Sequence, residues 1–205
     1  MESKILPESL MNQIFNIRQR NQLSDSILNY FTMSIGFFFY GCLYADIIYN
    51  QETLSLFYEF IIIAGIIQIV LGIYDWYKGK SLTLLTNILL GLLFISWYYK
   101  YQRILKKEPT YKDKQYEGII YILLFALALV LIISVKNKGI MYSINYLVLA
   151  VSFAFVIVDK YAHKDWSKKT FGYCFIVLGG LFWITGLLRF INAQFLNRTF
   201  SLVKE

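Results

Sequence analysis

Six long apolar runs constrain this chain more than any other feature. They cover residues 27–49, 56–76, 81–99, 118–135, 140–158 and 171–191. A bilayer core about 30 Å thick is crossed by roughly 20 apolar residues in an α-helix, and the runs have about that length. Strands of a membrane barrel alternate apolar and polar residues, whereas a run such as 119–135 does not alternate. The sequence therefore predicts an all-α membrane protein with six transmembrane helices.

Composition agrees with this reading and excludes several classes of protein. Of the 205 residues, 58% are hydrophobic and 16% are charged, against about 45–50% and about 25% in soluble domains. We therefore exclude a soluble enzyme, a disordered tail and a nucleic-acid-binding module. The net charge of +7 comes from short clusters of Lys and Arg between the apolar runs, which is typical of headgroup anchors. Cys42 and Cys174 lie inside apolar runs, so we interpret them as buried fillers rather than as a disulfide or a metal site.

The chain divides into three parts around the membrane domain. Residues 1–26 carry apolar residues at three- and four-residue steps, which is typical of a helix lying along the membrane interface. A frayed amphipathic tail is the alternative. Pro7 and several acidic residues in this segment argue against a cleaved signal peptide. Residues 27–192 then form the transmembrane domain, and residues 193–205 form a C-terminal tail. We expect an integral multi-pass protein of the cell (plasma) membrane.

A polar connection over residues 100–117, broken by Pro109, separates three helices from three helices. Three crossings are an odd number, so the second half would be inverted relative to the first, as in many transporters. The halves also share an Asp-x-Tyr-x-x-Lys order, which is read at Asp75, Tyr77 and Lys80 and again at Asp159, Tyr161 and Lys164. We therefore expect a 3+3 inverted repeat. The alternative is that helix ends collect such residues at the headgroups in any case.

Glycines recur every seven residues in two of the runs, at Gly65, Gly72 and Gly79 and at Gly172, Gly179 and Gly186. Seven residues are nearly two turns of an α-helix, so each trio forms a stripe along which another helix can approach closely. We interpret both stripes as packing surfaces. The alternative is that part of a stripe faces a pore.

Polar residues within the runs suggest a path for a small polar solute. They are Gln68, Thr83, Thr86, Asn87, Ser143, Asn145 and Thr185. Such side chains also join helices to one another inside a membrane, so interhelical hydrogen bonding is the alternative for each of them. Gln68 is the strongest candidate for a residue that meets solute.

Ionisable residues are missing from the central third of every run. Those that the runs or their margins carry lie near the ends, and they include Asp46, Glu59, Asp75, Asp159 and Arg189. Ion-coupled carriers usually keep such a group at mid-depth, so the pattern favours a channel-like or weakly coupled path. His163 follows the fifth run and reads as a headgroup residue. No metal cluster or nucleophile with a base can be assembled at one depth, so we predict no enzyme, no cofactor and no metal.

Several of these segments resemble one family. The run GIIQIVLGIYDWYKGKSLTLL from Gly65 to Leu85 is similar to the junction of the second and third helices in the acetate uptake transporters, the succinate–acetate/proton symporter (YaaH-like) family. Residues 115–118 resemble the start of that family's fourth helix. Gly172, Gly179 and the segment NAQFLNRT from Asn192 resemble its sixth helix and closing segment. The resemblance covers about residues 56–200.

The resemblance implies a six-helix protomer that assembles into hexamers and moves acetate and related small carboxylates through a central passage. It implies an apolar constriction at Leu90 and Leu149, with Ile35 as a third position. Gln68 matches the family glutamine. A hydrophobic neck can gate by dewetting, and a coupled protein of this kind would use a proton. The expected partners are thus a small carboxylate, protons, lipid and further copies of the chain, with no nucleic acid.

The chain also departs from the family pattern at the solute path. Family members carry an Asn-Pro-Ala-Pro-Leu-Gly-Leu motif where the first helix begins, whereas residues 24–31 read SDSILNYF without a proline. Leu90 stands where the family has an aromatic residue. Substrate identity is therefore less constrained than the fold.

Three functional hypotheses follow. The first is a transporter or channel for acetate-like monocarboxylates, in which Gln68, Thr86 and Asn87 supply hydrogen bonds and Leu90 with Leu149 forms the neck. It expects a continuous route that is apolar at its waist and lightly polar on both flanks. The second is a structural membrane subunit that packs through its glycine stripes and moves nothing. It expects a filled interior, with Gln68 and Asn87 bonded to neighbouring helices. The third is a pore for a small neutral solute.

Overall fold

The computed structural model describes residues 27–47, 51–105, 114–135, 140–162 and 165–194. A first helix, Ile27–Tyr44, is followed by α2 (Gln51–Tyr77), α3 (Ser81–Leu105), α4 (Lys114–Ser134), α5 (Ile140–Ala162) and α6 (Asp165–Gln194). Over these residues the chain is all-helical, without a strand. The prediction of six membrane helices is confirmed. The interfacial segment 1–26 and nearly all of the tail 193–205 lie outside the described residues.

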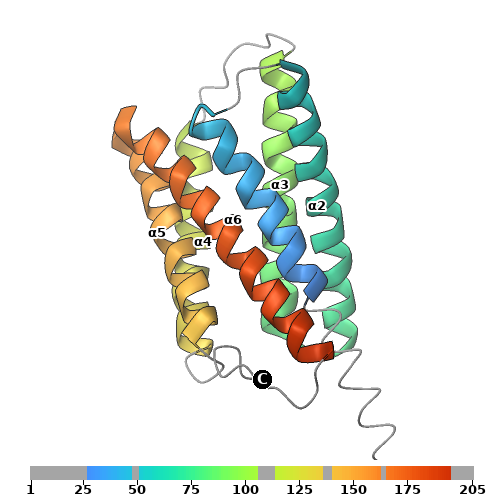
Figure 1. Ribbon diagram of the computed structural model, residues 1–205. Coiled ribbons are helices and arrows are strands. Elements are labelled where there is room, and N and C mark those ends of the chain that lie inside the picture. Colours follow the sequence, from blue (N-terminus) through green and yellow to red (C-terminus); the bar gives the residue numbers. More distant parts are fainter. Residues whose placement is uncertain (1–26, 48–50, 106–113, 136–139, 163–164, 195–205) are drawn as a thin grey trace, which may run out of the picture.

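Successive helices run in opposite directions, so that the bundle has two distinct ends (Figure 1). α2 packs along α3, and α4 packs along α5, which also contacts α6. In Figure 1 the α2–α3 pair and the α4–α5 pair stand on opposite sides, with the blue first helix and the orange-red α6 crossing in front of them. The end at which the first helix begins therefore also holds the end of α2 and the end of α6. We call this the cavity end, and the other the distal end.

Five helices are long and apolar enough to cross a membrane, and the fourth contributes a shorter apolar stretch, Gly118–Ser134. Their outer faces carry large exposed apolar side chains. Examples are Ile63, Ile66, Val70, Ile120, Leu123, Ile133, Leu147 and Val177. An apolar outer surface of this extent suits lipid rather than water. The chain is an integral multi-pass membrane protein.

Close approach of glycines sets the packing of two helix pairs. A Cβ added at Gly91 of α3 would lie 2.7 Å from the carbonyl oxygen of Gly65 on α2, so these two backbones touch. On α6, a Cβ at Gly172 would lie 2.8 Å from the carbonyl carbon of Tyr44, and one at Gly179 would lie 2.8 Å from the amide nitrogen of Phe38, both on the first helix. Such approach requires residues without side chains. The glycines at these four positions serve helix packing.

Gly79 departs from the predicted stripe. It has a φ of +71°, and nothing lies within 4 Å of a Cβ added there. The amide of Gly79 donates to the carbonyl of Trp76 at 2.9 Å, and that of Lys80 donates to the carbonyl of Asp75 at 2.9 Å. A 6→1 bond after a left-handed glycine is the Schellman ending of a helix. Gly79 therefore ends α2 and turns the chain into α3.

The helix ends also differ from the predicted spans. The first span was expected to reach residue 49, but its helix ends at Tyr44 and is followed by a turn in which Asp46 has a φ of +57°. α6 begins at Asp165, earlier than the predicted residue 171. Hydropathy marks the part of a helix that lies in lipid, whereas hydrogen bonding continues into the headgroup layer, so the two boundaries need not agree.

The two halves match in one detail of the shared Asp-x-Tyr-x-x-Lys order. Asp75, near the end of α2, accepts a hydrogen bond from Asn87 on the following helix, α3. Asp159, near the end of α5, accepts one at 3.4 Å from Ser167 on the following helix, α6. Lys164 lies outside the described residues. The inverted repeat itself stays a prediction.

The distal half of the interior is filled by aromatic side chains from four helices. Tyr40 stacks on Trp97 with ring centroids 3.4 Å apart, and Phe37 stacks on Phe175 at 5.4 Å. The described members of this aromatic cluster are Phe37, Tyr40, Phe94, Trp97, Phe153, Phe171 and Phe175. All of them are buried. The core is therefore built mainly by aromatic packing on the distal side.

Candidate functional site

A cavity of about 490 Å³ opens inside the bundle at the cavity end. Residues from all six helices line it, because the topology brings the ends of α2, α4 and α6 together with the starts of the other three. The lining residues are Asn29, Tyr30, Met33, Leu71, Tyr74, Asp75, Gly79, Lys80, Ser81, Leu82, Thr83, Thr86, Asn87, Leu131, Ser134, Val135, Tyr142, Tyr146 and Arg189. The volume lies within the usual range of small-molecule sites.

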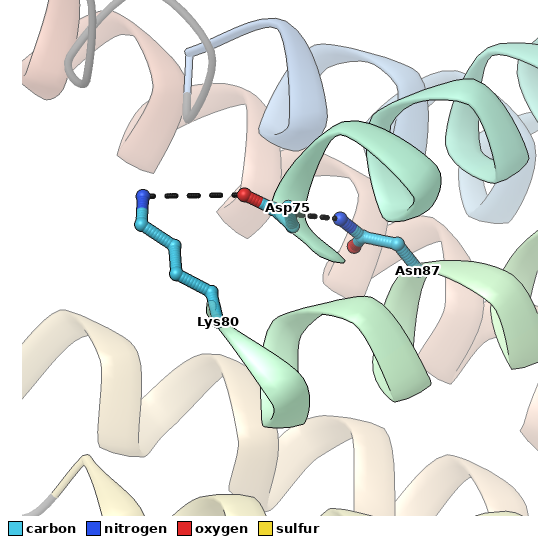
Figure 2. Close-up of polar contacts among 3 residues, drawn as sticks. All are labelled: Asp75, Lys80 and Asn87. Atoms are coloured by element: carbon cyan, nitrogen blue, oxygen red, sulfur yellow. Dashed lines mark hydrogen bonds and ion pairs between the residues drawn. The ribbon is translucent and has the colours of Figure 1, made fainter. Parts of the chain in front are cut away.

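Asp75 stands between a cation and an amide on one wall of this cavity (Figure 2). Its Oδ1 lies 3.9 Å from Nζ of Lys80, and its Oδ2 accepts a hydrogen bond of 3.0 Å from Nδ2 of Asn87. Asp75 itself is buried. The turn at Gly79 places Lys80 directly after α2, so the ion pair spans the junction between α2 and α3. The pair and the amide together fix the side chains of this wall.

Arg189 brings a second cation to the cavity, from the end of α6. Its Nε donates to the hydroxyl of Tyr142 on α5. Its guanidinium also lies over two aromatic rings, 5.5 Å from the centroid of Tyr30 and 5.1 Å from that of Tyr142. Such cation–π contacts hold a guanidinium in place without neutralising it. With Asp75, Lys80 and Arg189 all lining the cavity, its formal charge is positive.

Thr86 and Asn87 line the cavity, as two of the three predicted binding residues. Both are buried on α3, with exposed fractions of 3% and 0%. Thr86 donates its hydroxyl proton to the carbonyl of Leu82 at 2.8 Å. Asn87 is bonded to Asp75, and its Oδ1 has no hydrogen-bond partner within the described structure. Both residues therefore offer an acceptor oxygen to this part of the bundle.

Gln68, the third predicted binding residue, does not line the cavity. It is fully buried on α2, and its Nε2 donates to the carbonyl oxygen of Asn29 at 3.0 Å and to Oγ1 of Thr32. Both partners belong to the first helix. Its Oε1 has no partner among the described residues. In this structure Gln68 joins α2 to the first helix, which is the alternative that the sequence left open.

Leu90 and Leu149, the predicted constriction, lie one helical turn deeper than the cavity lining. Leu90 follows Thr86 by four residues, and Leu149 follows Tyr146 by three, so each lies on the same helix face as a lining residue. They are 1% and 2% exposed and belong to the central core. Ile35 is partly buried and packs against that core from the first helix. On that helix, Met33 lines the cavity.

The buried side-chain amides Gln68, Asn87 and Asn145 lie toward the cavity end, whereas the aromatic cluster lies toward the distal end. The hydrogen bond from Asn145 to Thr185, at 2.8 Å, joins α5 to α6 in the same half as the cavity. The distal half holds the aromatic cluster, in which Nε1 of Trp97 donates to the hydroxyl of Tyr121 at 2.8 Å. The sequence led us to expect a lightly polar stretch of the path on each side of the apolar constriction. The described interior has an open polar flank on one side and a packed aromatic half on the other.

Sequence reasoning missed the charged residues of the site. Asp75, Lys80 and Arg189 were interpreted as helix-end residues at the headgroups, and Tyr142 was not singled out. The alternating direction of successive helices could have indicated that these charges lie near one another. In a six-helix membrane protein, the end of α2, the start of α3 and the end of α6 all lie on the same side of the membrane. Tyr30 and Tyr142 carry no distinguishing signal in the sequence, since 17 tyrosines are spread along the chain.

The comparisons with known proteins support the fold. No protein-family model matches the sequence, and no curated protein matches it by sequence. Among solved structures, the chain is similar to the one described as the structure of the bacterial acetate channel SatP, with a TM-score of 0.74 and 16% sequence identity. The match covers 87% of this chain and 97% of that one. The six-helix fold is therefore shared with a known channel.

Proposed function

We propose that this protein is a membrane transporter or channel for acetate and related small monocarboxylates. The observation that carries the proposal is the cavity of about 490 Å³ inside a bundle whose fold is that of an acetate channel. Its formal charge is positive, because Lys80 and Arg189 face a single carboxylate, that of Asp75, among the lining residues. A positive, partly enclosed cavity raises the local concentration of anions.

In this proposal a carboxylate enters from the cavity end and meets Arg189 first. The rings of Tyr30 and Tyr142 hold the guanidinium, so that it can bind a planar carboxylate without losing side-chain freedom on binding. The solute then passes the apolar neck at Leu90 and Leu149. An apolar neck admits a small solute after it has shed water, and it remains closed to hydrated ions.

Passage through the distal half requires side chains to move. Tyr40 and Trp97 stack at 3.4 Å, which leaves no room for acetate between them. We propose that the described conformation is open toward the cavity end and closed at the aromatic cluster. Rotation of aromatic side chains would then open the second half, without rearrangement of the helices.

Uptake of labelled acetate into proteoliposomes tests the proposal. Vesicles containing the protein should accumulate acetate faster than empty vesicles of the same lipid. Applying a pH step, acid outside, distinguishes proton-coupled from uncoupled flux, because coupled uptake rises under the step beyond the increase measured in empty vesicles. Equal rates with and without protein would overturn the proposal.

A non-transporting structural subunit is the second candidate. The packed aromatic half favours it, and so do Gln68 and Asn87, both of which bond to a neighbouring helix. The cavity counts against it, because a cavity lined by two cations is costly to maintain in a purely structural bundle. A pore for a neutral solute is the third candidate. Swelling assays with urea, with and without acetate as competitor, separate it from the first.

The oligomeric state belongs to the same proposal. We propose a hexamer, as the family resemblance implies, and the exposed apolar faces of the helices can pack against lipid or against further copies of the chain. Light scattering of the detergent-solubilised protein, corrected for bound detergent, measures the protein mass directly. A monomeric mass of 24.1 kDa in several mild detergents would contradict the hexamer.

A further inference from the structure

The α3 wall of the cavity presents hydrogen-bond acceptors. An ionised carboxylate accepts hydrogen bonds and cannot donate them. The NH₂ group of Asn87 must therefore face Asp75, to which it is bonded at 3.0 Å, and its Oδ1 must face away. That oxygen is buried on a residue with no exposed surface, and it has no partner within the described structure. A buried acceptor of this kind needs a donor.

Asp75 is held in this role by its own partner. Nζ of Lys80 lies 3.9 Å from Oδ1, which leaves Oδ2 to accept the hydrogen bond from Asn87 (Figure 2). Asp75 thus fixes the orientation of an amide that could otherwise turn over and present NH₂ to the cavity. We treat Asp75 as a positioning residue, because it acts on a ligand through Asn87.

Two further oxygens extend the acceptor wall. The hydroxyl proton of Thr86 is committed to the carbonyl of Leu82, so its oxygen can only accept in this arrangement. Oδ1 of Asn29, which lines the cavity from the first helix, is buried and has no partner among the described residues. The cavity therefore combines cations, at Lys80 and Arg189, with acceptor oxygens on Asn87 and Asn29 that have no hydrogen-bond partner among the described residues.

A ligand that matches both features carries a carboxylate and a hydrogen-bond donor in one small molecule. We propose that the cavity selects small 2-hydroxy carboxylates over plain carboxylates of the same size. Their carboxylate binds toward Arg189, and their hydroxyl donates to Oδ1 of Asn87. A small shift of the lining side chains must accompany binding, because this oxygen has almost no accessible surface in the described conformation. This inference rests on the proposed function and narrows its substrate class. Plain carboxylates at neutral pH have no donor, and they leave the Asn87 oxygen unsatisfied.

Glycolate and propionate provide a matched test, because a hydroxyl in one replaces a methyl group in the other. Uptake of each labelled acid is measured in proteoliposomes at pH 7, and leakage into empty vesicles is subtracted. We expect glycolate to be favoured about fivefold in kcat/KM, which is the size of effect that one hydrogen bond supports. This order opposes simple permeation, in which the more apolar propionate is faster. A ratio near one would overturn the inference.

Two variants assign the preference to residues. Asn87→Leu removes the acceptor and should bring the glycolate to propionate ratio close to one. Asp75→Asn removes the fixed orientation of the Asn87 amide and should lower the ratio in part. Asn145→Leu is the control, since it removes a buried amide from the same half that does not line the cavity. It should keep the wild-type ratio. The ratio is the readout because absolute rates also respond to misfolding.

The outcomes separate this inference from the proposed function. If acetate is taken up but the ratio of kcat/KM for glycolate to that for propionate is near one, only the inference is overturned and the proposed function stands. If none of the three acids enters protein-containing vesicles faster than it enters empty vesicles, the proposed function is overturned. In that case, thermal stabilisation of the solubilised protein by glycolate over propionate still tests the inference, and equal stabilisation overturns it. A ratio near one together with uptake that follows the concentration of undissociated acid likewise overturns the inference, and it identifies the protonated acid as the transported species.

Discussion

Arg189, near the end of α6, donates a hydrogen bond from its Nε to the hydroxyl of Tyr142, near the start of α5. The two residues are 47 positions apart in the sequence and meet because both belong to the cavity end of the bundle. The contact orients one edge of the guanidinium toward α5. It makes Arg189 the best-supported cation in the cavity.

Replacing this cation should weaken carboxylate binding. For Arg189→Gln we expect the KM for acetate to rise about tenfold with a smaller change in kcat, because a charge-assisted bond to a carboxylate is lost. Labelled uptake at varied acetate concentration measures both constants. Lys169→Gln is the control, since Lys169 pairs with Asp46 at the distal end at 3.7 Å. Equal KM values for wild type and Arg189→Gln would contradict the assignment.

Replacing a side chain of the neck with a larger one should slow acetate transport. Leu149 is buried below the cavity at 2% exposure, so Leu149→Trp should lower acetate flux by about tenfold or more through steric closure. Leu147→Trp is a matched control on the same helix, because Leu147 is 55% exposed on the outer face. Uptake rates normalised to reconstituted protein compare the two. The neck assignment fails if both variants carry acetate at the wild-type rate.

Opening the aromatic half should have the opposite effect. Trp97→Ala removes the ring that stacks on Tyr40 and should raise acetate flux several-fold, if the aromatic cluster is the closed gate. The same change leaves a cavity in the core and should lower thermal stability. Trp76→Ala is the control, since Trp76 is 63% exposed. A Trp97→Ala protein that folds, but carries acetate no faster than wild type, would show that the gate lies elsewhere.

The glycine contact between α2 and α3 should be essential for stability. Gly91→Ala places a Cβ 2.7 Å from the carbonyl oxygen of Gly65, so the helices must separate or shift, at a cost of about 1–3 kcal/mol. Thermal unfolding of the solubilised protein measures the loss. Gly180→Ala provides the comparison, because nothing lies within 4 Å of the added Cβ and helix propensity improves. Gly91→Ala with an unchanged Tm would mean that the two backbones can separate without cost.

Much of the fold could be predicted from the sequence because the bilayer sets one length for every membrane helix. The positions of the glycine contacts also followed, since Gly172 and Gly179 lie on one face of any α-helix. Gly79 shows the limit of that argument. The same spacing places it on the stripe, but a helix ending in a left-handed residue depends on local hydrogen bonds that periodicity does not contain.

The candidate site could be predicted only in part. Thr86 and Asn87 stood out as polar residues in an apolar run, and both line the cavity. Gln68 stood out equally, yet its bond to the first helix depends on how the two helices cross. The sequence of α6 alone shows only that Arg189 lies near a helix end, which is typical of a headgroup residue. Its aromatic partners belong to other helices, so the pattern of α6 does not indicate them. Contacts between helices are set by rotation and crossing angle, which hydropathy does not determine.

The aromatic half could not be predicted from spacing. Phe37, Trp97 and Phe175 come from three different helices, and each is an ordinary apolar residue in its own run. Their clustering on the distal side becomes visible only when the helices are placed side by side. It is this clustering that divides the interior into a cavity half and a closed half.

Blocking the cavity chemically tests the central claim, that small carboxylates cross the membrane through it. Thr83 lines the cavity and is half-buried, so Thr83→Cys in a protein with Cys42→Ala and Cys174→Ala places one thiol there. The solubilised protein is treated with a charged thiol reagent before reconstitution, and Lys169→Cys in the same background serves as the control. We predict labelled acetate uptake above empty vesicles before treatment, and its loss after labelling at position 83 but not at 169. Uptake that is absent from the start, or unchanged after complete labelling at position 83, would contradict the account.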